Sequence, residues 1–271
     1  MIFRHPNQSD WETFSTLTCL ENWRVPHTEL QLLKGPWAHY VRVLDDDKFC
    51  GLATSVAYEN SAWIGNLIVP HNLRGKGYGS HLFKTVLTDL VGQGMKTIWL
   101  TASDQGRSIY EREGFVEVDR IERWVLPPPG NSTGSLLQGE NSYEKLFYAD
   151  RLAWSENRAP LLSVLFNGGK VFSVEGAIAL LQAGPDVQIV GPWYAHEASL
   201  HAQQNLLDIM IAATDPNIPV FVDLLASSPL PALCDSSGFQ LTGQTSLMAY
   251  GDIGSIDLKS MVSLASLGSV G

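Results

Sequence analysis

Three glycines in five residues lie in the segment 74–80 (RGKGYGS), and they give this stretch the clearest capacity for chemistry in the sequence. Glycine adopts the conformations of a tight turn and lets an anion approach the backbone closely. Apolar residues then recur at helical spacing over 82–91, which predicts a helix with one buried face. Free N–H groups and the helix dipole at its start favour a phosphate, and Arg74 and Lys76 add positive charge. The segment matches neither a P-loop nor GxGxxG, so a simple glycine-rich turn is the alternative.

The elements that must position this loop follow from patterning in the first half of the chain. We expect a helix with Asp10 as its N-cap, and a second helix ending at Gly35. A turn rich in aspartate separates two strand-like runs and indicates a hairpin. The expected elements are helices 10–20, 27–35, 82–91 and 105–113, and strands 39–45, 49–58, 63–69, 95–103 and 115–126.

Composition is that of an ordinary globular protein, with 45% hydrophobic and 17% charged residues in 271. We expect no membrane span and no secretory signal. The three cysteines form no CxxC pair, which favours a reducing, cytoplasmic setting. The net charge is −10, of which −2 falls in residues 1–126 and −8 in the remainder. Without a basic face, we do not expect nucleic acid as a partner. A cationic small substrate is compatible with this charge, but the favoured interpretation is that the negative surface only aids solubility.

The second half follows a segment rich in Pro, Gly, Ser and Asn, residues 127–142, which we interpret as a linker. We interpret residues 254–271, small and serine-rich, as weakly packed. Between these segments the pattern predicts helices 143–154, 195–213 and 229–237, and strands 160–167, 170–182, 186–193, 218–226 and 239–250.

An internal repeat relates the two halves. Residues 98–118 align without gaps with 222–242, and both read as strand, short helix, Gly-Phe and strand. The pair Gly114-Phe115 meets Gly238-Phe239. Two similar folding units are therefore expected. The second half has no counterpart of the glycine-rich loop, so only the first can form the phosphate cradle.

The loop, the strand before it and Tyr110 four residues ahead of Gly114-Phe115 together resemble the GCN5-related N-acetyltransferase (GNAT) superfamily. The resemblance covers roughly residues 1–126, with 143–251 as a degenerate second copy. The segments 156–162 and 189–195 are similar to the C-terminal domain of a tandem-GNAT subgroup. The fold class implied is α/β (α+β): two GNAT-like units, each a mixed, mostly antiparallel sheet flanked by helices, with a splayed strand pair in the first.

The resemblance implies acetyl-CoA as cosubstrate. No metal is expected, because His196 and His201 are five residues apart and do not form an HExxH pair. Backbone amides of the loop would hold the pyrophosphate, and the end of the preceding strand would pair with the pantetheine arm. The family often has Asn seven residues before the tyrosine, where this chain has Ser103. The implied cofactor-binding residues are Leu67, Ile68, Val69, Arg74, Gly75, Lys76, Gly77, Tyr78, Gly79, Ser80 and Ser103.

By the same resemblance, an amine attacks the thioester directly, a backbone N–H near Val69 stabilises the oxyanion, and Tyr110 protonates the leaving thiolate as general acid. Packing in the core is the alternative role for Tyr110. The places where some family members carry a base are Trp63 and Gly65, which cannot titrate. Weak candidates for the base are His27, Glu59 and His71, each also suited to a surface role.

We therefore predict a GNAT catalytic domain at 1–126, a linker at 127–142, a degenerate GNAT-like domain at 143–252 and a tail at 253–271. The predicted function is acetyl transfer to a small-molecule or peptide amine, by a monomer with pseudo-dimeric halves or a homodimer. No nucleic acid and no membrane is expected as a partner. The alternative is a non-catalytic module that binds acyl-CoA.

Overall fold

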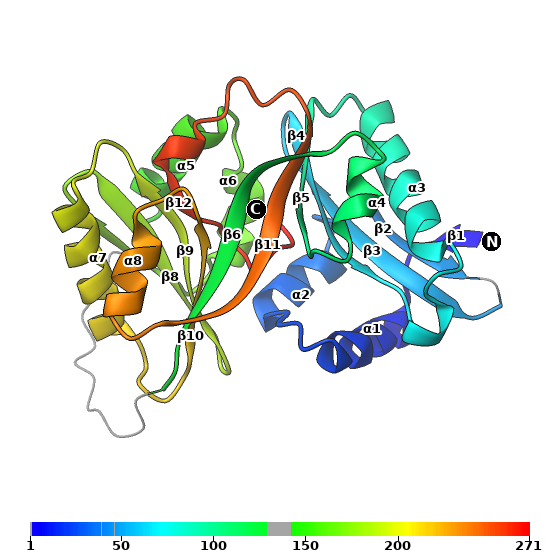
Figure 1. Ribbon diagram of the computed structural model, residues 1–271, viewed down its shortest axis with the longest axis horizontal. Coiled ribbons are helices and arrows are strands. Elements are labelled where there is room, and N and C mark those ends of the chain that lie inside the picture. The colour runs from blue at the N-terminus through cyan, green and yellow to red at the C-terminus, as the bar shows by residue number, and fades with distance from the viewer. Residues whose placement is uncertain (1, 39, 46, 129–141) are drawn as a thin grey trace. The chain divides into compact units, whose positions relative to one another are not determined.

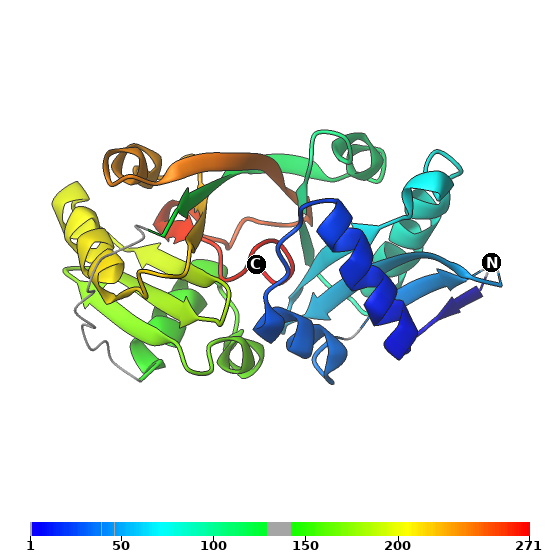
Figure 2. The same ribbon diagram turned by 90° about the horizontal axis from the view of Figure 1, so that it is seen from below.

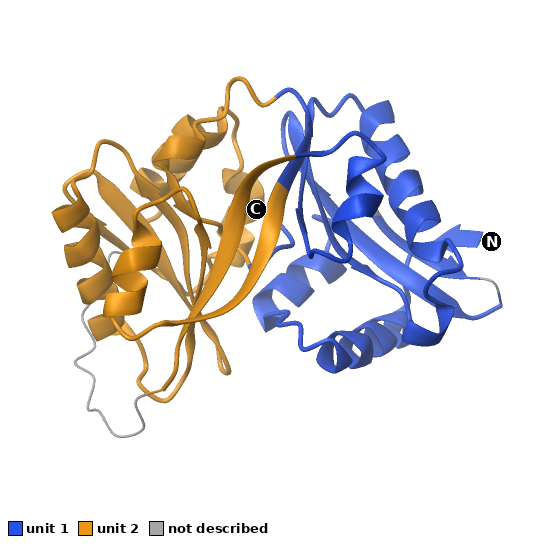
Figure 3. Cartoon of the chain, in the orientation of Figure 1, with its two compact units in different colours: residues 1–116, 248–252, 267–271 blue, residues 117–247, 253–266 orange. Residues whose placement is uncertain are grey.

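A computed structural model describes residues 2–38, 40–45, 47–128 and 142–271. The chain forms two compact units, each discontinuous in sequence (Figure 3). Unit 1 comprises residues 1–116, 248–252 and 267–271, and unit 2 comprises 117–247 and 253–266. The mixed α/β, mostly antiparallel fold predicted from the sequence is confirmed.

The sequence predicted continuous domains at 1–126 and 143–252, whereas residues 117–126 belong to unit 2. Strand pairing explains this difference. Strand β6 (Val116–Leu126) pairs antiparallel with β10 (Val220–Leu225) from Ile121 to Leu126, so it belongs largely with unit 2. The predicted linker 127–142 lies almost wholly outside the described residues.

Unit 1 has one sheet in the order β1-β2-β3-β4-β5, followed by the end of β11, and only β4 and β5 are parallel among the pairs formed by β1 to β5. Its strands are β1 (Ile2–Arg4), β2 (Tyr40–Asp45), β3 (Phe49–Ala57), β4 (Ser61–Ile68), β5 (Thr97–Ala102) and the end of β11 (Gln240–Gly251). Its helices are α1 (Gln8–Leu20), α2 (His27–Lys34), the 3-10 turn η1 (His71–Leu73), α3 (Tyr78–Gly92) and α4 (Arg107–Glu111).

The helices of unit 1 cover both faces of its sheet (Figures 1 and 2). On one face α3 packs against β2, β3 and β4, because its apolar stripe from Leu82 to Leu90 interleaves with alternate strand residues such as Ala62 and Ile64. On the other face α1 packs against β3 and β4. The predicted amphipathic helix after the glycine loop is thus confirmed, with its buried face toward the sheet.

One helix start differs from the prediction. Asn7, rather than Asp10, is the N-cap of α1, and Asp10 is the third helical residue. The side chain of Asn7 accepts from the Asp10 amide, and that of Asp10 accepts from the Asn7 amide at 2.7 Å. This capping box satisfies two N–H groups at once, which explains why the helix begins earlier.

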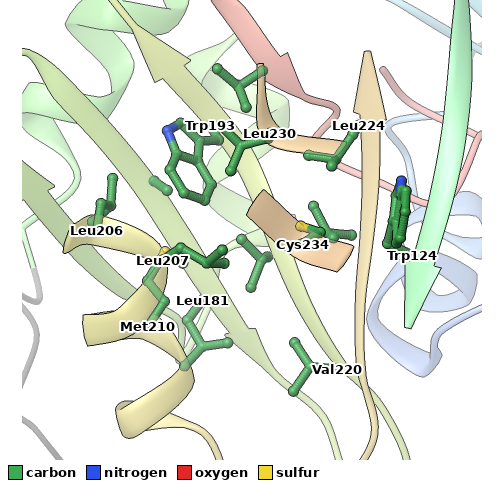
Figure 4. Packing of buried hydrophobic residues seen from close by; sticks show 14 of the residues in the cluster. Trp124, Leu181, Trp193, Leu206, Leu207, Met210, Val220, Leu224, Leu230 and Cys234 are labelled. Atoms are coloured by element: carbon green, nitrogen blue, oxygen red, sulfur yellow. The ribbon is translucent and has the colours of Figure 1, made fainter. Parts of the chain in front are cut away.

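Unit 2 repeats the arrangement with the strand order β11-β6-β10-β12-β9-β8-β7. Its core gathers Leu206, Leu207 and Met210 of α7 and Cys234 of α8 against the sheet (Figure 4). The additional elements are α5 (Glu144–Trp154), α6 (Ala159–Leu165), β7 (Lys170–Val174), β8 (Ala177–Ala183), β9 (Gln188–Ala195), α7 (Leu200–Ala213), α8 (Leu230–Ser236), the 3-10 turn η2 (Leu258–Ser260) and β12 (Met261–Ser263).

Three sequence-based assignments in this half were wrong. The predicted strand 160–167 is instead largely helix α6 (Ala159–Leu165), because a proline in the first turn suits a helix and Leu161, Leu162 and Leu165 share one buried side. Residues 170–182 form the hairpin β7–β8 instead of one strand, turning at Glu175-Gly176, where both residues have positive φ. The segment 254–271 is largely buried and contains β12, so it is not weakly packed.

The internal repeat is confirmed by corresponding elements. Strand, short helix and strand occur as β5, α4, β6 and again as β10, α8, β11. Gly114 and Gly238 both adopt left-handed backbone, with φ of +90° and +86°. The amide of the following phenylalanine donates to the carbonyl of Tyr110 in one copy and of Cys234 in the other. The Gly114-Phe115 and Gly238-Phe239 pairs, which are aligned in the sequence, therefore occupy equivalent positions in the fold.

Candidate active site

The parallel strands β4 and β5 part within unit 1. Their pairing joins Ser61–Thr97, Ala62–Ile98 and Trp63–Trp99, and among the described residues it ends there. A bulge in β4 follows, because Leu52 and Thr54 of β3 lie opposite Ile68 and Gly65, three residues apart. In the described residues, β4 and β5 therefore separate after Trp63 and Trp99 and leave a gap in the strand ladder. This confirms the splayed pair predicted from the sequence.

The glycine-rich loop opens α3 at the end of β4. Gly77 is the N-cap, with φ of +83°, and no side chain caps the helix. Gly75 is also left-handed, with φ of +74°, and a Cβ at either glycine would meet nothing within 4 Å. The start of α3 thus offers uncapped amides beside open space, which is the environment that an anion requires.

The two basic residues of the loop differ in their surroundings. Arg74 donates from Nε to the carbonyl of Val69 at 3.1 Å and forms an ion pair with Glu21 at the end of α1. Lys76 is exposed. Arg74 is therefore tied to α1 and to the end of β4.

Tyr110 lies on the α3 side of the sheet. Its ring packs edge-on against Phe83 of α3, with ring centroids 4.8 Å apart. The centroid of the same ring lies 6.3 Å from that of Phe115. Burial raises the pKa of its phenol to about 12 because the anion is poorly solvated there. The hydroxyl is accordingly protonated at neutral pH and able to donate a proton or a hydrogen bond.

The other predicted site residues occupy mixed environments. Ile68 is buried, and Leu67 and Val69 are half-buried at the end of β4. Gly79 and Ser80 lie in the first turn of α3, and Ser103 is exposed just after β5, where its hydroxyl accepts from the Gly106 amide at 3.3 Å. Each of the candidate bases His27, Glu59 and His71 is exposed.

A buried carboxylate that the sequence reasoning missed lies on the opposite face of unit 1. Glu29 of α2 is 2% exposed and accepts a hydrogen bond from the hydroxyl of Ser269. Glu29 lies three residues before Leu32 and four before Leu33, and all three are buried on α2. This helical spacing is the sequence signal that predicts a buried position for Glu29. Among the described residues, no group of three His, Cys, Asp or Glu side chains is placed to hold a metal.

The described residues of unit 2 are arranged differently at the equivalent place. Strand β12 lies between β9 and β10, pairing Leu224 with Ser263 and Met261 with Tyr194, so the corresponding gap is filled by the chain itself. The start of α7 is capped by Ser199, whose hydroxyl accepts from the Ala202 amide at 3.1 Å. The part of unit 2 that the structure describes therefore offers neither an open gap nor an uncapped helix at the equivalent place.

The residues of unit 1 fit a ligand with an anionic group and an extended amide-bearing arm. The anion would meet the start of α3, and the arm would run along the unpaired part of β4. Tyr110 lies on the same side of the sheet as α3, so its hydroxyl could serve the reactive end of such a ligand.

The comparisons agree with this geometry. Residues 6–115 match the model of the Acetyltransferase (GNAT) family. The ribosomal protein bS18 alanine N-acetyltransferase of Haemophilus influenzae is 24% identical over 99 residues, which are 36% of this chain and 68% of that protein.

Solved structures resemble the whole chain. One is a Pyrococcus horikoshii protein assigned as an acetyltransferase, with a TM-score of 0.78, 19% identity, and coverage of 100% of this chain and 95% of that chain. Another is a tandem GNAT protein of the clavulanic acid biosynthesis pathway, with a TM-score of 0.60, 14% identity, and coverage of 92% and 98%. At sequence identities of 19% and 14%, these structures show that the chain shares their fold.

The match of residues 6–115 and the Haemophilus relative support the GNAT superfamily and acetyl transfer for unit 1, and the solved structures show the shared fold. The matched residues all lie within unit 1, which holds the open gap and the uncapped helix. In the part of the chain that the structure describes, no helix is long and apolar enough to cross a membrane.

Proposed function

We propose that unit 1 transfers an acetyl group from acetyl-CoA to a primary amine by direct attack, and that unit 2 is a degenerate copy of the tandem-GNAT kind. The observation that carries the proposal is the juxtaposition of the gap between β4 and β5 with the uncapped start of α3. The family match within unit 1 supports it.

Each predicted residue has a role in this proposal. The amides from Gly75 to Ser80 bind the pyrophosphate, Arg74 and Lys76 add charge, and Leu67, Ile68 and Val69 pair with the pantetheine arm through their main chain. Ser103, just beyond β5, makes a further contact with the arm.

Tyr110 supplies a proton to the departing thiolate. Its phenol, with a pKa raised to about 12, is protonated throughout the physiological range, as a general acid requires. The amine attacks in its neutral form and needs a route for its proton. The acceptor is a small-molecule or peptide amine, and the activity named for the Haemophilus relative makes a peptide beginning with alanine a rational first choice.

The test is thiol release from acetyl-CoA with a panel of amines: n-butylamine, its branched isomer sec-butylamine, lysine, spermidine and an alanine-initiated peptide. We expect release that depends on at least one amine, with acetylated product found by mass spectrometry. Calorimetry with CoA is run in parallel.

A second candidate function is a module that binds acyl-CoA without turnover. The absence of a titratable side chain at Trp63 and Gly65 favours it. Tight CoA binding without release from any amine would establish this alternative and reject catalysis. Absence of CoA binding would reject both.

A further inference from the structure

The two faces of β4 and β5 are occupied differently. Ala62 and Ile64 of β4 and Ile98 and Leu100 of β5 belong to the core under α3. Side chains alternate along a strand, so Trp63 and Gly65 point to the opposite face. That face carries α1, whereas α3, with the uncapped amides at its start, covers the other face. The face that carries α1 is therefore the side from which an amine would approach the gap.

The end of the chain, residues 267–271, lies on this face within unit 1. The Trp63 indole donates to the Gly268 carbonyl at 3.0 Å, and the Tyr58 hydroxyl donates to the Val270 carbonyl. A Cβ on Gly268 would lie 2.9 Å from the hydroxyl oxygen of Thr101 in β5. Gly268 thus contacts β4 at Trp63, the last paired position, and lies beside Thr101 of β5, two residues beyond the last pair.

The contact between β4 and this segment is tight. A Cβ on Gly65 would lie 2.9 Å from the Cα of Ser269, closer than side chains tolerate. Ser269 is 2% exposed, and Val270 is fully buried. Gly65 is required here for close backbone approach, so the segment is fitted to the strand as a fixed part of unit 1.

Polar contacts hold the middle of the segment. Asn66, which has a φ of +52° in the bulge of β4, donates from its amide to the hydroxyl of Ser269 at 2.9 Å. That hydroxyl in turn donates to Glu29. A buried network of this kind fixes geometry because breaking one bond leaves a polar group unsatisfied.

We propose that residues 267–271 form the fixed wall of the acceptor site and determine which amines it accepts. This inference rests on the proposed function. Residues 267–271 cover Trp63 and Gly65, the two positions where a base was expected by resemblance. An acceptor therefore meets the main chain of Gly268, which is partly exposed, while Ser269 is buried behind it. A wall fixed in place beside the end of the β4–β5 pairing cannot move aside for bulk, so it admits an unbranched primary amine and excludes an amine branched at the α-carbon.

Gly65→Ala tests the proposal, because the added methyl group pushes Ser269 off β4. Ser269→Ala is the milder second variant, which removes the bonds to Asn66 and Glu29 without adding bulk. Gly92→Ala is the matched control, since a Cβ there meets nothing within 4 Å. Measurements are hydrogen exchange of 267–271, CoA affinity, acetyl-CoA hydrolysis without amine, and the ratio of kcat/KM for n-butylamine and sec-butylamine.

In both test variants we expect exchange of 267–271 to accelerate at least about tenfold while CoA affinity changes less than about twofold. The preference for the unbranched amine should fall by about tenfold, and the control should change neither this preference nor the rate of hydrolysis. Faster exchange with an unchanged preference would overturn the wall, whatever the rate of hydrolysis. So would equal acceleration of both amines, which would mean that the segment merely blocks the site. If the unaltered protein releases no thiol under any condition, the proposed function itself fails.

Discussion

The indole of Trp63 and the carbonyl of Gly268 are joined by a hydrogen bond of 3.0 Å, although 205 residues separate them in sequence. The same indole stacks on Trp99 of β5, with ring centroids 6.4 Å apart and planes 16° from parallel. Trp63, a position where the resemblance predicts a catalytic base, therefore anchors residues 267–271 beside the point where β4 and β5 part.

Replacement of Tyr110 by Phe should lower turnover by about 10²-fold or more, since it removes the proton donor to the thiolate. Affinity for CoA should change by less than about twofold, because the ring still packs on Phe83. Steady-state kinetics and calorimetry measure the two quantities. Tyr148→Phe, at an exposed position in α5, is the control. Equal turnover in the Tyr110 and Tyr148 variants would remove Tyr110 from the mechanism.

The charge of the phosphate cradle is tested at Gly77 by a pair of variants of equal size. Asp and Asn both tolerate the left-handed backbone that Gly77 adopts, but only Asp repels a pyrophosphate. We expect Gly77→Asp to weaken CoA binding by about 10²-fold or more, and Gly77→Asn by less than about tenfold. Calorimetry that found equal affinities for the two variants would contradict the cradle.

The ion pair between Arg74 and Glu21 predicts opposite effects for its two partners. Arg74→Ala should weaken CoA binding because it removes a positive charge beside the loop. Glu21→Gln should tighten it by up to about fivefold, since an exposed ion pair that competes for Arg74 is worth about 0–1 kcal/mol. The matched control is Glu12→Gln on the same helix, where the carboxylate accepts from Gln8. If Glu21→Gln weakens binding, Arg74 does not contact the ligand.

The free energy of unfolding should fall as the pH rises above about 9, because the anions of Cys234 and Tyr110 are disfavoured in the folded interior. Burial raises the pKa of Cys234 from 9.0 to about 12, and that of Tyr110 from 10.0 to about 12. The folded chain then holds protons that the unfolded chain has lost, so the free energy of unfolding decreases between these values. Each group contributes at most about 1.4 kcal/mol per pH unit.

Urea unfolding at about pH 8 and about pH 10 measures this slope, and Cys234→Ala isolates one contribution. The variant should lose less stability than the unaltered protein over that interval. A slope equal to that of the unaltered protein would show that the Cys234 thiolate is not disfavoured by the fold.

The sequence by itself determined the elements around the glycine loop. Helical spacing after Gly79 predicted the buried face of α3, and the paired Gly-Phe motifs predicted two related units. These features are local: periodicity and the special conformations of glycine act over a few residues, so they can be read from the sequence. Helix α6 was wrongly predicted as a strand, because a short apolar run suits either a strand or a buried helix.

The tertiary structure alone decided how the end of the chain is used. The residues from 254 onward, small and rich in serine, carry no periodic pattern, yet β12 fills the gap in unit 2 and 267–271 lie against β4 in unit 1. It also decided that Glu29 meets Ser269. Such contacts depend on complementary surfaces between residues far apart in sequence, and neither partner's local pattern encodes them.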